Sequence, residues 1–394
     1  MFSKILSINS GSTSIKYALF SRGKKVCWGI ADRIGLPGSF IILNCDGEKT
    51  FRCKLKNHSE ALNEIFRILT ANSVIRSLSE IGAVGHRVVH GGKFNESVVI
   101  TKHVISTIRR YSRLAPLHNP ANLLGIRACA KLMPKAIQVA VFDTAFHTSI
   151  PKRSRAYPIP LKYYKEGIVR YGFHGISHNY ACLKAAEILG KKLKNLRVIS
   201  CHLGGGSSVA AVLSGRCIDT SMGFTPMEGL MMGTRCGDVD PGIIIHLLKN
   251  GMSVEELETM LNRKSGVIGI MGDSSDFRDV LKGLKSGSPK ARLAFEMFAY
   301  RISKYIGAYA AALGGVDVII FTGGIGQNSG VLRSAVLKNL EFLGVHIDKE
   351  KNMKNEELIS EKDSPVKVVV VKADEERMIA LETERVLRKQ KRNA

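Results

Sequence analysis

Two arginines in glycine-rich segments are the side chains best suited to carry chemistry. Arg87 lies in the segment GHRVVHGG (85–92), and Arg235 lies in MGTRCGD (232–238). A forked guanidinium donates paired hydrogen bonds to phosphate oxygens, and phosphoryl transfer requires cations on the equatorial oxygens of the transferring group. Either arginine alone could instead hold its loop by donating to carbonyl groups. The two loops together favour phosphoryl transfer.

Three loops of small residues would suit the phosphates themselves. Residues 9–14 read NSGSTS and residues 202–208 read HLGGGSS, and each loop separates two apolar runs. This pattern predicts a strand, a turn and a second strand, and the exposed N–H groups and hydroxyls of such a turn suit phosphate oxygens. A third segment, GGIG (323–326), joins an apolar run to a helical pattern, where a tight turn would need glycine in any case. Two matching hairpins predict two related domains that bind a nucleotide's phosphates from opposite sides.

Carboxylates are scarce near these loops, so the few candidates are informative. Asp143 directly follows the apolar run 137–142, and Glu375 follows the last predicted strand. Open α/β sheets keep their chemistry at the carboxyl ends of buried strands. Asp143 is therefore the candidate for a catalytic or metal-side role, and Glu375 is placed to reach Mg²⁺ through water. Asp238 and Asp240 are expected to organise their own loop.

Histidines recur beside the same loops, and they would either donate hydrogen bonds to an anionic ligand or serve the structure. No carboxylate completes a zinc set with His86 and His90. The chain also lacks a P-loop and the protein-kinase motifs, since Asp276-Phe277-Arg278 is only superficially similar to DFG. The recurring histidines are His86, His90, His118, His147, His174, His178 and His202.

Strand and helix patterns alternate along the chain, which is typical of an α/β protein. Ser253 and Glu256 form a capping-box signature, and the basic, Pro-containing segment 149–160 is expected to cross between domains. Strands are predicted at 4–9, 15–20, 39–43, 81–90, 137–142, 197–201, 209–213, 316–321 and 366–371. Helices are predicted at 59–72, 121–132, 177–189, 291–313, 331–343 and 374–389.

The formal net charge of +24 is the unusual feature of the composition. Because the basic residues are spread along the chain, a solvated basic surface is favoured over nucleic-acid binding.

There is no run of 18 apolar residues to predict a membrane span, and the N-terminal sequence is not typical of a secretory signal. Eight scattered cysteines fit reduced thiols in a cytosolic protein, and 394 residues have room for two domains.

At these loops the sequence resembles the acetate kinase family, which belongs to the actin-like phosphotransferases. The likeness spans nearly the whole chain, and the signatures NSGSTSIK (9–16) and SCHLGGGSS (200–208) are highly specific. Further matching segments are GHRVVHGG (85–92), APLHNP (115–120), VFDTAFH (141–147), RYGFHGISH (170–178), TPMEGLMMGTRCGDVDPG (225–242), FTGGIGQNSG (321–330) and ADEERMIA (373–380).

The resemblance implies an α/β fold of two actin-like (RNase H-like) domains, each with a mixed sheet flanked by helices, and a nucleotide cleft between them. The N-terminal domain would comprise residues 1–147 and a returning helix at 377–394, and the nucleotide-binding domain 148–376. The implied reaction is reversible transfer of the γ-phosphoryl group of ATP to acetate, giving acetyl phosphate and ADP. The resemblance also implies Mg²⁺ (or Mn²⁺), a homodimer and a cytoplasmic location, with neither nucleic acid nor a membrane as partner.

Roles for individual residues follow from the matched segments. The implied catalytic residues are Arg87, Asp143, His174 and Arg235, and the metal-positioning pair is Asn9 and Glu375. The implied pocket for the methyl group of the acid is Val89, Leu117, Phe173 and Pro226, with Arg87 as a further substrate contact. The implied nucleotide-binding residues are Ser14, Lys16, His202, Leu203, Gly204, Gly205, Gly206, Asp276, Phe277, Arg278, Gly323, Gly324, Ile325, Gly326 and Gln327. Ser12 would support the phosphate end, and His118 and His202 would be secondary site residues.

Two positions depart from the family pattern. Gly205 stands where the family has asparagine, and Gln327 stands where it has glutamate. Both changes bear on nucleotide affinity or on the preference among ATP, GTP and pyrophosphate. Alternatives to an acetate kinase are a propionate or short-chain acyl kinase, a sugar kinase with Asp143 as base, and an actin-like module that binds nucleotide without catalysis. Val89, rather than a smaller residue, favours acetate.

Overall fold

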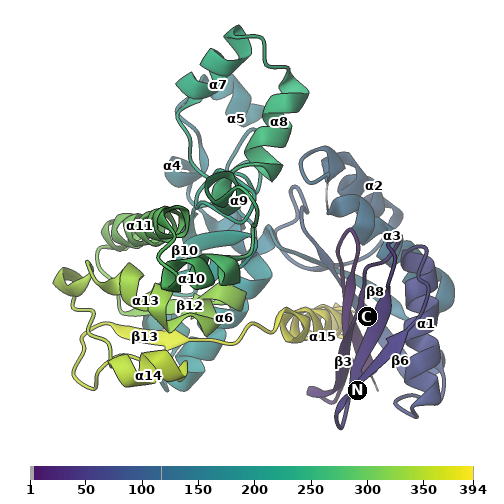
Figure 1. Ribbon diagram of the computed structural model, residues 1–394. Helices are drawn as coiled ribbons and strands as arrows, with labels where there is room; N and C mark the ends of the chain where they lie inside the picture. Colours follow the sequence, from purple (N-terminus) through teal and green to yellow (C-terminus); the bar gives the residue numbers. More distant parts are fainter. Residues whose placement is uncertain (1–3, 117, 394) are drawn as a thin grey trace. The chain divides into compact units, whose positions relative to one another are not determined.

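The computed structural model describes residues 4–116 and 118–393, and the chain folds into two compact units. Unit 1 contains the residues up to Phe146 and those from Asp374 onward, and unit 2 contains His147–Ala373. The two units meet along the chain after residues 146 and 373, and the predicted domain boundaries, after residues 147 and 376, lie within three residues of these positions. An α/β fold with two mixed sheets flanked by helices is confirmed (Figure 1).

Unit 1 is built on an eight-stranded mixed sheet with the strand order β5-β4-β3-β2-β1-β6-β8-β7. β1 pairs in parallel with β6, and β6 with β8, whereas the other neighbours are antiparallel. The strands are β1 (Lys4–Ser10), β2 (Ile15–Ser21), β3 (Lys24–Asp32), β4 (Phe40–Asn44), β5 (Glu48–Arg52), β6 (Ile81–Val88), β7 (Val98–Val99) and β8 (Ile137–Phe142). The α-helices of this unit are α1 (His58–Ala71), α2 (Lys102–Arg110), α3 (Asn119–Leu132) and α15 (Glu375–Asn393).

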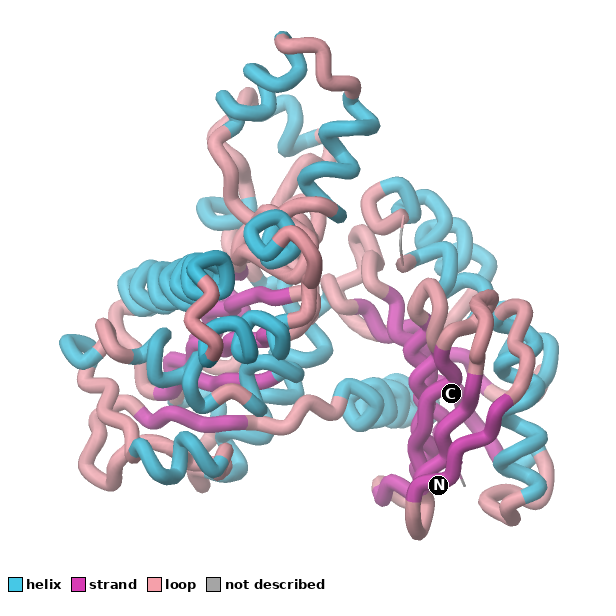
Figure 2. Tube along the Cα trace, in the orientation of Figure 1, coloured by secondary structure: helices cyan, strands magenta, loops and turns pink. Residues whose placement is uncertain are grey.

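Alternation along β1 places helices on both faces of this sheet. Leu6 and Ile8 pack in a core with α1 and α3, whereas Ser7 donates a hydrogen bond to the carbonyl of Glu376 in α15. Because successive side chains of a strand point to opposite faces, Asn9 lies on the same face as α15. Figure 2 shows the coils of α15 beside the strands of unit 1.

Unit 2 is built on a five-stranded mixed sheet with the order β11-β10-β9-β12-β13. Along β9, Ile199, Cys201 and Leu203 pack in the core that includes α11, whereas Ser200 faces α6 through His178. The strands are β9 (Arg197–Leu203), β10 (Ser207–Leu213), β11 (Arg216–Thr220), β12 (Val318–Thr322) and β13 (Lys367–Val370). The helices are α4 (Lys152–Arg155), α5 (Leu161–Lys165), α6 (Gly175–Ile188), α7 (Pro241–Lys249), α8 (Val254–Arg263), α9 (Gly266–Met271), α10 (Phe277–Lys285), α11 (Pro289–Leu313), α12 (Gly323–Asn328), α13 (Gly330–Leu337) and α14 (Lys349–Lys354).

The two sheets share one arrangement of five strands. In unit 1, β3-β2-β1 is antiparallel and β1 continues through its parallel neighbours β6 and β8. In unit 2, β11-β10-β9 is antiparallel and β9 continues through its parallel neighbours β12 and β13. Both predicted hairpins, β1–β2 and β9–β10, are therefore present. Because parallel strands end at the same edge of a sheet, the loops after them gather at one edge in each unit.

Several elements differ from the predicted ones. β3 and β5 are absent from the predicted strands, since their sequences KKVCWGIAD and EKTFR mix charged with apolar residues. The GGIG segment, expected as a turn, instead begins the short helix α12, and the φ angle of +78° at Gly323 allows the chain to bend sharply after β12. The helix predicted at 331–343 ends at Leu337. The segment 149–160, expected between domains, lies within unit 2.

Some local sequence signals have direct counterparts in the structure. Ser253 and Glu256 form both hydrogen bonds of the predicted capping box at the start of α8. All eight cysteines are free thiols, and five of them are buried. Within the described residues, none of the helices is long and apolar enough to span a bilayer.

Replacing Gly85 by alanine should loosen α15 from the sheet of unit 1. A Cβ atom at this position of β6 would collide with Thr383 and Ile379 of α15, and overpacking of this kind costs about 1–3 kcal/mol. The single tryptophan, Trp28, lies in unit 1 and reports urea unfolding of that unit by fluorescence. Gly307→Ala in α11 is the control, because its added Cβ would meet no neighbour within 4 Å. Unchanged unfolding of Gly85→Ala would contradict this packing.

Candidate functional site

Four predicted residues of unit 1 form one group of charged and amide side chains, the Arg87 cluster (Asn9, Arg87, Asp143 and Glu375). Nε and Nη2 of Arg87 donate to Oδ2 of Asp143 at 3.1 and 2.7 Å. Nη1 lies 3.2 Å from Oε2 of Glu375 and 3.4 Å from Oδ1 of Asn9. Nδ2 of Asn9 donates to the same Glu375 oxygen at 3.2 Å. The guanidinium therefore contacts the other three members of the cluster.

This cluster forms because β1, β6 and β8 run parallel and end at the same edge of the sheet. Asn9 is the penultimate residue of β1 and Arg87 that of β6, and the two strands are in register there. Asp143 follows directly after β8, and Glu375 is the first residue of α15. Four segments that are far apart in the sequence thus supply one side chain each.

Opposite charges dominate the electrostatics of the Arg87 cluster. Burial alone would lower the pKa of the Arg87 guanidinium, but Asp143 and Glu375 raise its pKa above the usual value. Asp143 is only 1% exposed, so its pairing with Arg87 is a buried salt bridge, and removal of either partner would leave an uncompensated charge. The neighbouring Glu376 has a raised pKa because of its burial and the charge of Glu375.

Two asparagines of α3 fix the loop that follows Arg87. Oδ1 of Asn122 accepts a hydrogen bond from the N–H of Val89 at 3.2 Å, and Oδ1 of Asn119 accepts one from the N–H of His90 at 3.0 Å. Both asparagines are buried, as is Val89. The backbone that carries this predicted substrate residue is therefore held by α3. Leu117, predicted in the same acyl pocket, lies outside the described residues.

In unit 2, the Arg235 guanidinium is partly buried and has no counter-charge among the described residues. Its Nη1 donates to the carbonyl of Pro226 at 3.2 Å and lies 3.6 Å from the sulfur of Met232. None of the ion pairs found among residues 4–116 and 118–393 includes Arg235. Burial lowers its pKa, yet an arginine stays protonated in proteins. The loop therefore presents an uncompensated positive charge.

His174 and a glycine-rich loop adjoin this guanidinium. The N–H of Gly233 donates to the carbonyl of Gly205 at 3.2 Å, which joins the two predicted segments. A Cβ atom on Gly206 would lie 3.2 Å from Nε2 of His174 and 3.7 Å from Nη1 of Arg235. His174 has a φ angle of +57° directly before α6, which is uncommon for a residue other than glycine. The structure thus brings an imidazole, a guanidinium and a bare stretch of backbone together.

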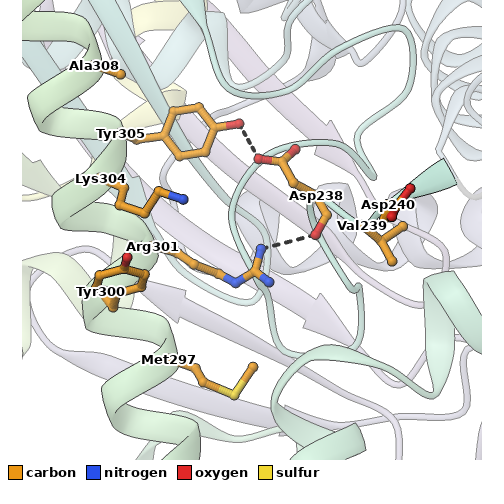
Figure 3. Close-up of a pocket in the computed structure, with 9 residues that line it drawn as sticks. All are labelled: Asp238, Val239, Asp240, Met297, Tyr300, Arg301, Lys304, Tyr305 and Ala308. Atoms are coloured by element: carbon orange, nitrogen blue, oxygen red, sulfur yellow. Dashed lines mark hydrogen bonds between the residues drawn. The ribbon is translucent and has the colours of Figure 1, made fainter. Parts of the chain in front are cut away.

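Asp238 anchors the Arg235 loop to α11. Tyr305 donates to Oδ2 of Asp238 at 2.6 Å, Arg301 donates to its backbone carbonyl at 3.1 Å, and the N–H of Gly229 donates to its Oδ1 at 2.8 Å. Figure 3 shows Tyr305 and Arg301 extending from α11 toward Asp238. These three side chains line a cavity of about 550 Å³ whose walls include none of the predicted site residues. Asp238 therefore organises its loop, as its position in the sequence suggests.

A partly buried ion pair holds the beginning of the same loop. Nη2 of Arg170 donates to Oε1 of Glu228 at 2.6 Å, and its Nη1 donates to the carbonyl of Thr220 at 2.9 Å. Tyr157 donates a short hydrogen bond to the other oxygen of Glu228. Burial alone would lower the pKa of Arg170, but Glu228 and Tyr157 raise it. The loop is thus fixed on both sides of Arg235 by charged groups that are themselves paired.

The two predicted nucleotide loops of unit 2 follow β9 and β12. Residues 204–206 join β9 to β10, and α12 begins at Gly323. A Cβ atom on Gly205 would meet nothing within 4 Å, so the asparagine of the family pattern would fit there. Oε1 of Gln327 accepts a hydrogen bond from the N–H of Ala373 at 2.9 Å. Gln327 therefore bonds to the chain just before α15.

The remaining predicted nucleotide residues differ in what they can offer a ligand. Asp276 caps α10 by accepting from the N–H of Arg278, and the two side chains form an exposed ion pair. The ring of Phe277 is buried in the core of unit 2, which leaves only its backbone for a ligand. In unit 1, Ser14 lies at the tip of the β1–β2 hairpin and Lys16 is exposed on β2.

Two buried serines beside the histidines, Ser177 and Ser208, are absent from the predicted site residues. Oγ of Ser208 lies 2.9 Å from Nδ1 of His174 and 2.8 Å from Nε2 of His178. Oγ of Ser177 lies 2.7 Å from Nδ1 of His202. The segment HGISH carried a usable signal, since Ser177 and His178 follow His174 by three and four residues and so share one face of a helix. Ser208 had no such signal, because only the β9–β10 pairing brings it to α6.

Comparison with known proteins places this arrangement in a family. The model of the Acetokinase family matches residues 4–381. The chain belongs to the acetokinase family. An acetate kinase from Thermotoga maritima is 53% identical, with 98% of this chain and 99% of that protein covered. One from Carboxydothermus hydrogenoformans is 51% identical, with 96% of this chain and 98% of that protein covered. The chain is accordingly a kinase-type phosphotransferase.

Solved structures of the acetokinase family agree with this assignment. The crystal structure of Porphyromonas gingivalis acetate kinase has a TM-score of 0.91 at 44% identity, covering 98% of this chain and 100% of that chain. The crystal structure of a propionate kinase from Francisella tularensis has a TM-score of 0.91 at 39% identity, with the same coverage. The predicted membership is confirmed, and proteins named for two different acids share this fold.

Unit 2 should lose stability as the pH falls from about 6.5 to 4. Burial lowers the pKa of His147 to about 4, so in this range the unfolded chain binds a proton that the folded chain does not, and stability falls with pH. One such histidine costs at most about 1.4 kcal/mol per pH unit. His147→Gln should therefore weaken the pH dependence of urea unfolding followed by circular dichroism. The same change at the exposed His246 serves as control, and equal pH dependence in wild type and His147→Gln would refute this account.

Proposed function

We propose that the chain is an acetate kinase that transfers the γ-phosphoryl group of ATP to acetate, reversibly and with Mg²⁺, to give acetyl phosphate and ADP. Relatives named acetate kinase, at 51% and 53% identity over nearly the full length, support this reaction. The observation that carries the proposal is the partly buried guanidinium of Arg235, which has no carboxylate partner among the described residues and is adjacent to His174 and Gly206. A buried cation without a partner is unfavourable in the free protein, and an anionic ligand would supply its counter-charge.

The acceptor explains why the reaction would need cations more than a base. The carboxyl group of acetate is already ionised near neutral pH, so no proton has to be removed before its oxygen attacks phosphorus. The obstacle is the repulsion between this carboxylate and the terminal phosphate. Arg235 and His174 of unit 2 would stabilise the charge of the phosphoryl group during transfer, and Arg87 of unit 1 would add a second guanidinium. Asp143 would orient Arg87 through its two hydrogen bonds.

The Arg87 cluster also fits a magnesium ion by its donor set. Oδ1 of Asn9 and the carboxylate of Glu375 are hard oxygen ligands, and protein-bound Mg²⁺ usually combines one or two carboxylates with substrate phosphates. The two side chains are already joined by the hydrogen bond from Nδ2 of Asn9 to Oε2 of Glu375. Asn9 and Glu375 would hold the ion, which would supply neutralisation of phosphate charge when bound.

Trapping with hydroxylamine tests the proposed reaction directly. Incubation of the protein with ATP, Mg²⁺ and acetate should give acetyl phosphate, which hydroxylamine converts to a coloured hydroxamate. A sugar kinase would consume ATP with a sugar and give no hydroxamate. A module that only binds nucleotide would give neither product. Absence of hydroxamate in the presence of nucleotide binding would therefore refute the proposed function.

Arg235→Ala should abolish turnover without destabilising the fold. An arginine that stabilises the transferring phosphoryl group contributes roughly 10³–10⁵ in rate. Its removal breaks no ion pair among the described residues, so the urea midpoint should stay at or above that of the wild type. The hydroxamate assay and urea unfolding measure the two effects. Arg263→Ala, at an exposed position of α8, is the control, and retention of a tenth of the activity in Arg235→Ala would exclude this role.

A propionate kinase is the second candidate, because the Francisella tularensis protein of that name has the same TM-score as the acetate kinase of Porphyromonas gingivalis. Acetate and propionate differ by one methylene, which an apolar pocket discriminates by about 1–3 kcal/mol. Val89, Leu117, Phe173 and Pro226 remain the residues proposed to set this limit. Val89 favours acetate over the longer acids.

Val89→Ala should shift the preference toward longer acids. A smaller side chain frees space for about one methylene, so kcat/KM for propionate relative to acetate should rise roughly tenfold or more. The wild-type protein should prefer acetate over propionate and propionate over butyrate. Val139→Ala, which shortens a buried valine of β8, controls for a general loss of packing. A wild-type preference for butyrate would contradict the proposed acyl pocket.

A homodimer and a cytoplasmic location stay predictions from the family resemblance. Sedimentation of the purified protein would measure the oligomeric state. Nothing in the proposed chemistry requires a nucleic acid or a membrane.

A further inference from the structure

The hydroxyl of Ser208 lies between two histidines and links them into one chain of hydrogen bonds. Its Oγ is 2.9 Å from Nδ1 of His174 and 2.8 Å from Nε2 of His178. The other ring nitrogen of His178, Nδ1, is 2.9 Å from Oγ of Ser200. Ser208, His178 and Ser200 are each 0% exposed. The hydrogen bonds therefore run from His174 into the interior of unit 2 without a break.

Counting donors limits how protons can be distributed along this chain. A serine hydroxyl has one proton to donate, and a neutral imidazole has one N–H group. His178 is neutral near physiological pH, because burial, and to a lesser degree His147 and His202, hold its pKa well below the usual value. Ser208 therefore donates to at most one histidine. If it accepted from both, its own buried proton would lack an acceptor within this chain of hydrogen bonds. For a neutral His174, the chain then has two directions in which Ser208 donates to one histidine and accepts from the other.

In the first direction, Ser200 donates to Nδ1 of His178, Nε2–H of His178 donates to Ser208, and Ser208 donates to Nδ1 of His174. The proton of His174 is then on Nε2. In the second direction every bond is reversed, and the proton of His174 is on Nδ1. The direction of the whole chain thus decides which nitrogen of His174 carries its proton.

Ser200 makes the two directions of the hydrogen-bond chain unequal in free energy. In the first direction its hydroxyl proton has a partner in His178. In the second direction its oxygen accepts from His178, and its own proton needs another acceptor. Among the described residues, Ser200 Oγ forms no hydrogen bond other than the one with His178, so a buried donor would be left unsatisfied. Such a defect is unfavourable enough to favour the first direction by roughly tenfold or more.

We propose that Ser200, His178 and Ser208 are positioning residues that hold His174 as the Nε2–H tautomer. This tautomer matters because Nε2 adjoins the glycine-rich loop. A Cβ atom on Gly206 would lie 3.2 Å from Nε2 of His174 and 3.7 Å from Nη1 of Arg235. An N–H group there would donate to an anionic oxygen alongside the guanidinium, whereas a bare ring nitrogen would repel that oxygen. The value of this tautomer for phosphoryl transfer rests on the proposed function, but the tautomer itself does not.

The chain of hydrogen bonds also supports the unusual backbone conformation of His174. A φ angle of +57° is unfavourable for a histidine and persists only where the surrounding contacts determine it. The hydrogen bond from Ser208 holds Nδ1 and thereby fixes the plane of the ring relative to β10. One hydroxyl therefore sets both the orientation and the protonation pattern of His174.

Nitrogen NMR of the imidazole rings tests the proposal on the wild-type protein. The full chain is labelled with ¹⁵N in its histidine rings and measured at neutral pH without substrates, and the His174 signals are identified by their loss in His174→Gln. The expected spectrum has a protonated Nε2 and an unprotonated Nδ1 for His174. A protonated Nδ1 with an unprotonated Nε2 would overturn the proposal, whatever the variants do.

A substitution of Ser200, which is connected to His174 through His178 and Ser208, tests the chain of hydrogen bonds itself. Ser200→Ala removes the group that distinguishes the two directions, so the His174 signals should move toward a mixture of tautomers. Ser360→Ala is the matched control, because it deletes a buried hydroxyl of the same unit that forms no hydrogen bond among the described residues. Unchanged His174 signals in Ser200→Ala, or an equal change in Ser360→Ala, would contradict the proposed role of Ser200.

Kinetics separates positioning from mere structural support. Ser208→Ala should lower kcat for acetyl phosphate formation by about 10- to 100-fold with little change in KM for acetate, because the lost hydrogen bond to the phosphoryl group matters in the transition state. A parallel loss through KM would count against positioning. If the tautomer is as expected and no acyl phosphate forms, the proposed function fails alone. If the protein turns over acetate with the opposite tautomer, this proposal fails alone.

Discussion

The structure depends most on the guanidinium of Arg235, which is partly buried and which the described part of the chain leaves without a counter-charge. Charged groups inside proteins are normally paired, since an uncompensated charge is costly. Here the carboxylates of the surrounding loop have other partners: Glu228 forms an ion pair with Arg170, and Asp238 accepts a hydrogen bond from Tyr305. These fixed pairs on either side keep the loop in place while leaving Arg235 to an anionic ligand. The arrangement is expected of a site that binds a phosphoryl group and not of a site that only supports the fold.

Arg87, in contrast to Arg235, is paired with counter-charges. Its charge is neutralised by Asp143 and Glu375, and all three project from the carboxyl ends of parallel strands or from the helix beside them. The two arginines had looked alike in the sequence, since both lie in glycine-rich segments with histidines or glycines nearby. Their burial and partners distinguish them. Removal of Arg87 would break its ion pairs with Asp143 and Glu375, whereas removal of Arg235 would break no ion pair among the described residues, so only the second substitution separates catalysis from stability.

Much of this organisation could be predicted because it depends on local patterns. The two hairpins, the strand before Asp143 and the helices at 59–72 and 291–313 all follow from apolar periodicity and glycine. β3 could not be predicted this way, because Lys24 and Trp28 are exposed and Lys25 bonds to Asp374, so that charged and aromatic residues blur the apolar alternation. The pairing of Asn9 with Glu375, 366 positions apart, needed either the fold or the family resemblance. The bridging hydroxyl of Ser208 needed the fold, since side-chain hydrogen bonds across a sheet leave no periodic trace.

The state of Asp143 bears on which acceptor this site suits. A hydroxyl acceptor requires a general base whose oxygen can reach the proton of the substrate. Oδ2 of Asp143 already accepts two hydrogen bonds from Arg87, and the side chain is 1% exposed. A carboxylate that is committed to a guanidinium serves better to orient that guanidinium than to take up a proton. A carboxylic acid acceptor removes the need for a base altogether, because it arrives ionised. The geometry around Arg87 therefore favours acyl phosphate chemistry over the phosphorylation of a sugar, independently of any sequence comparison.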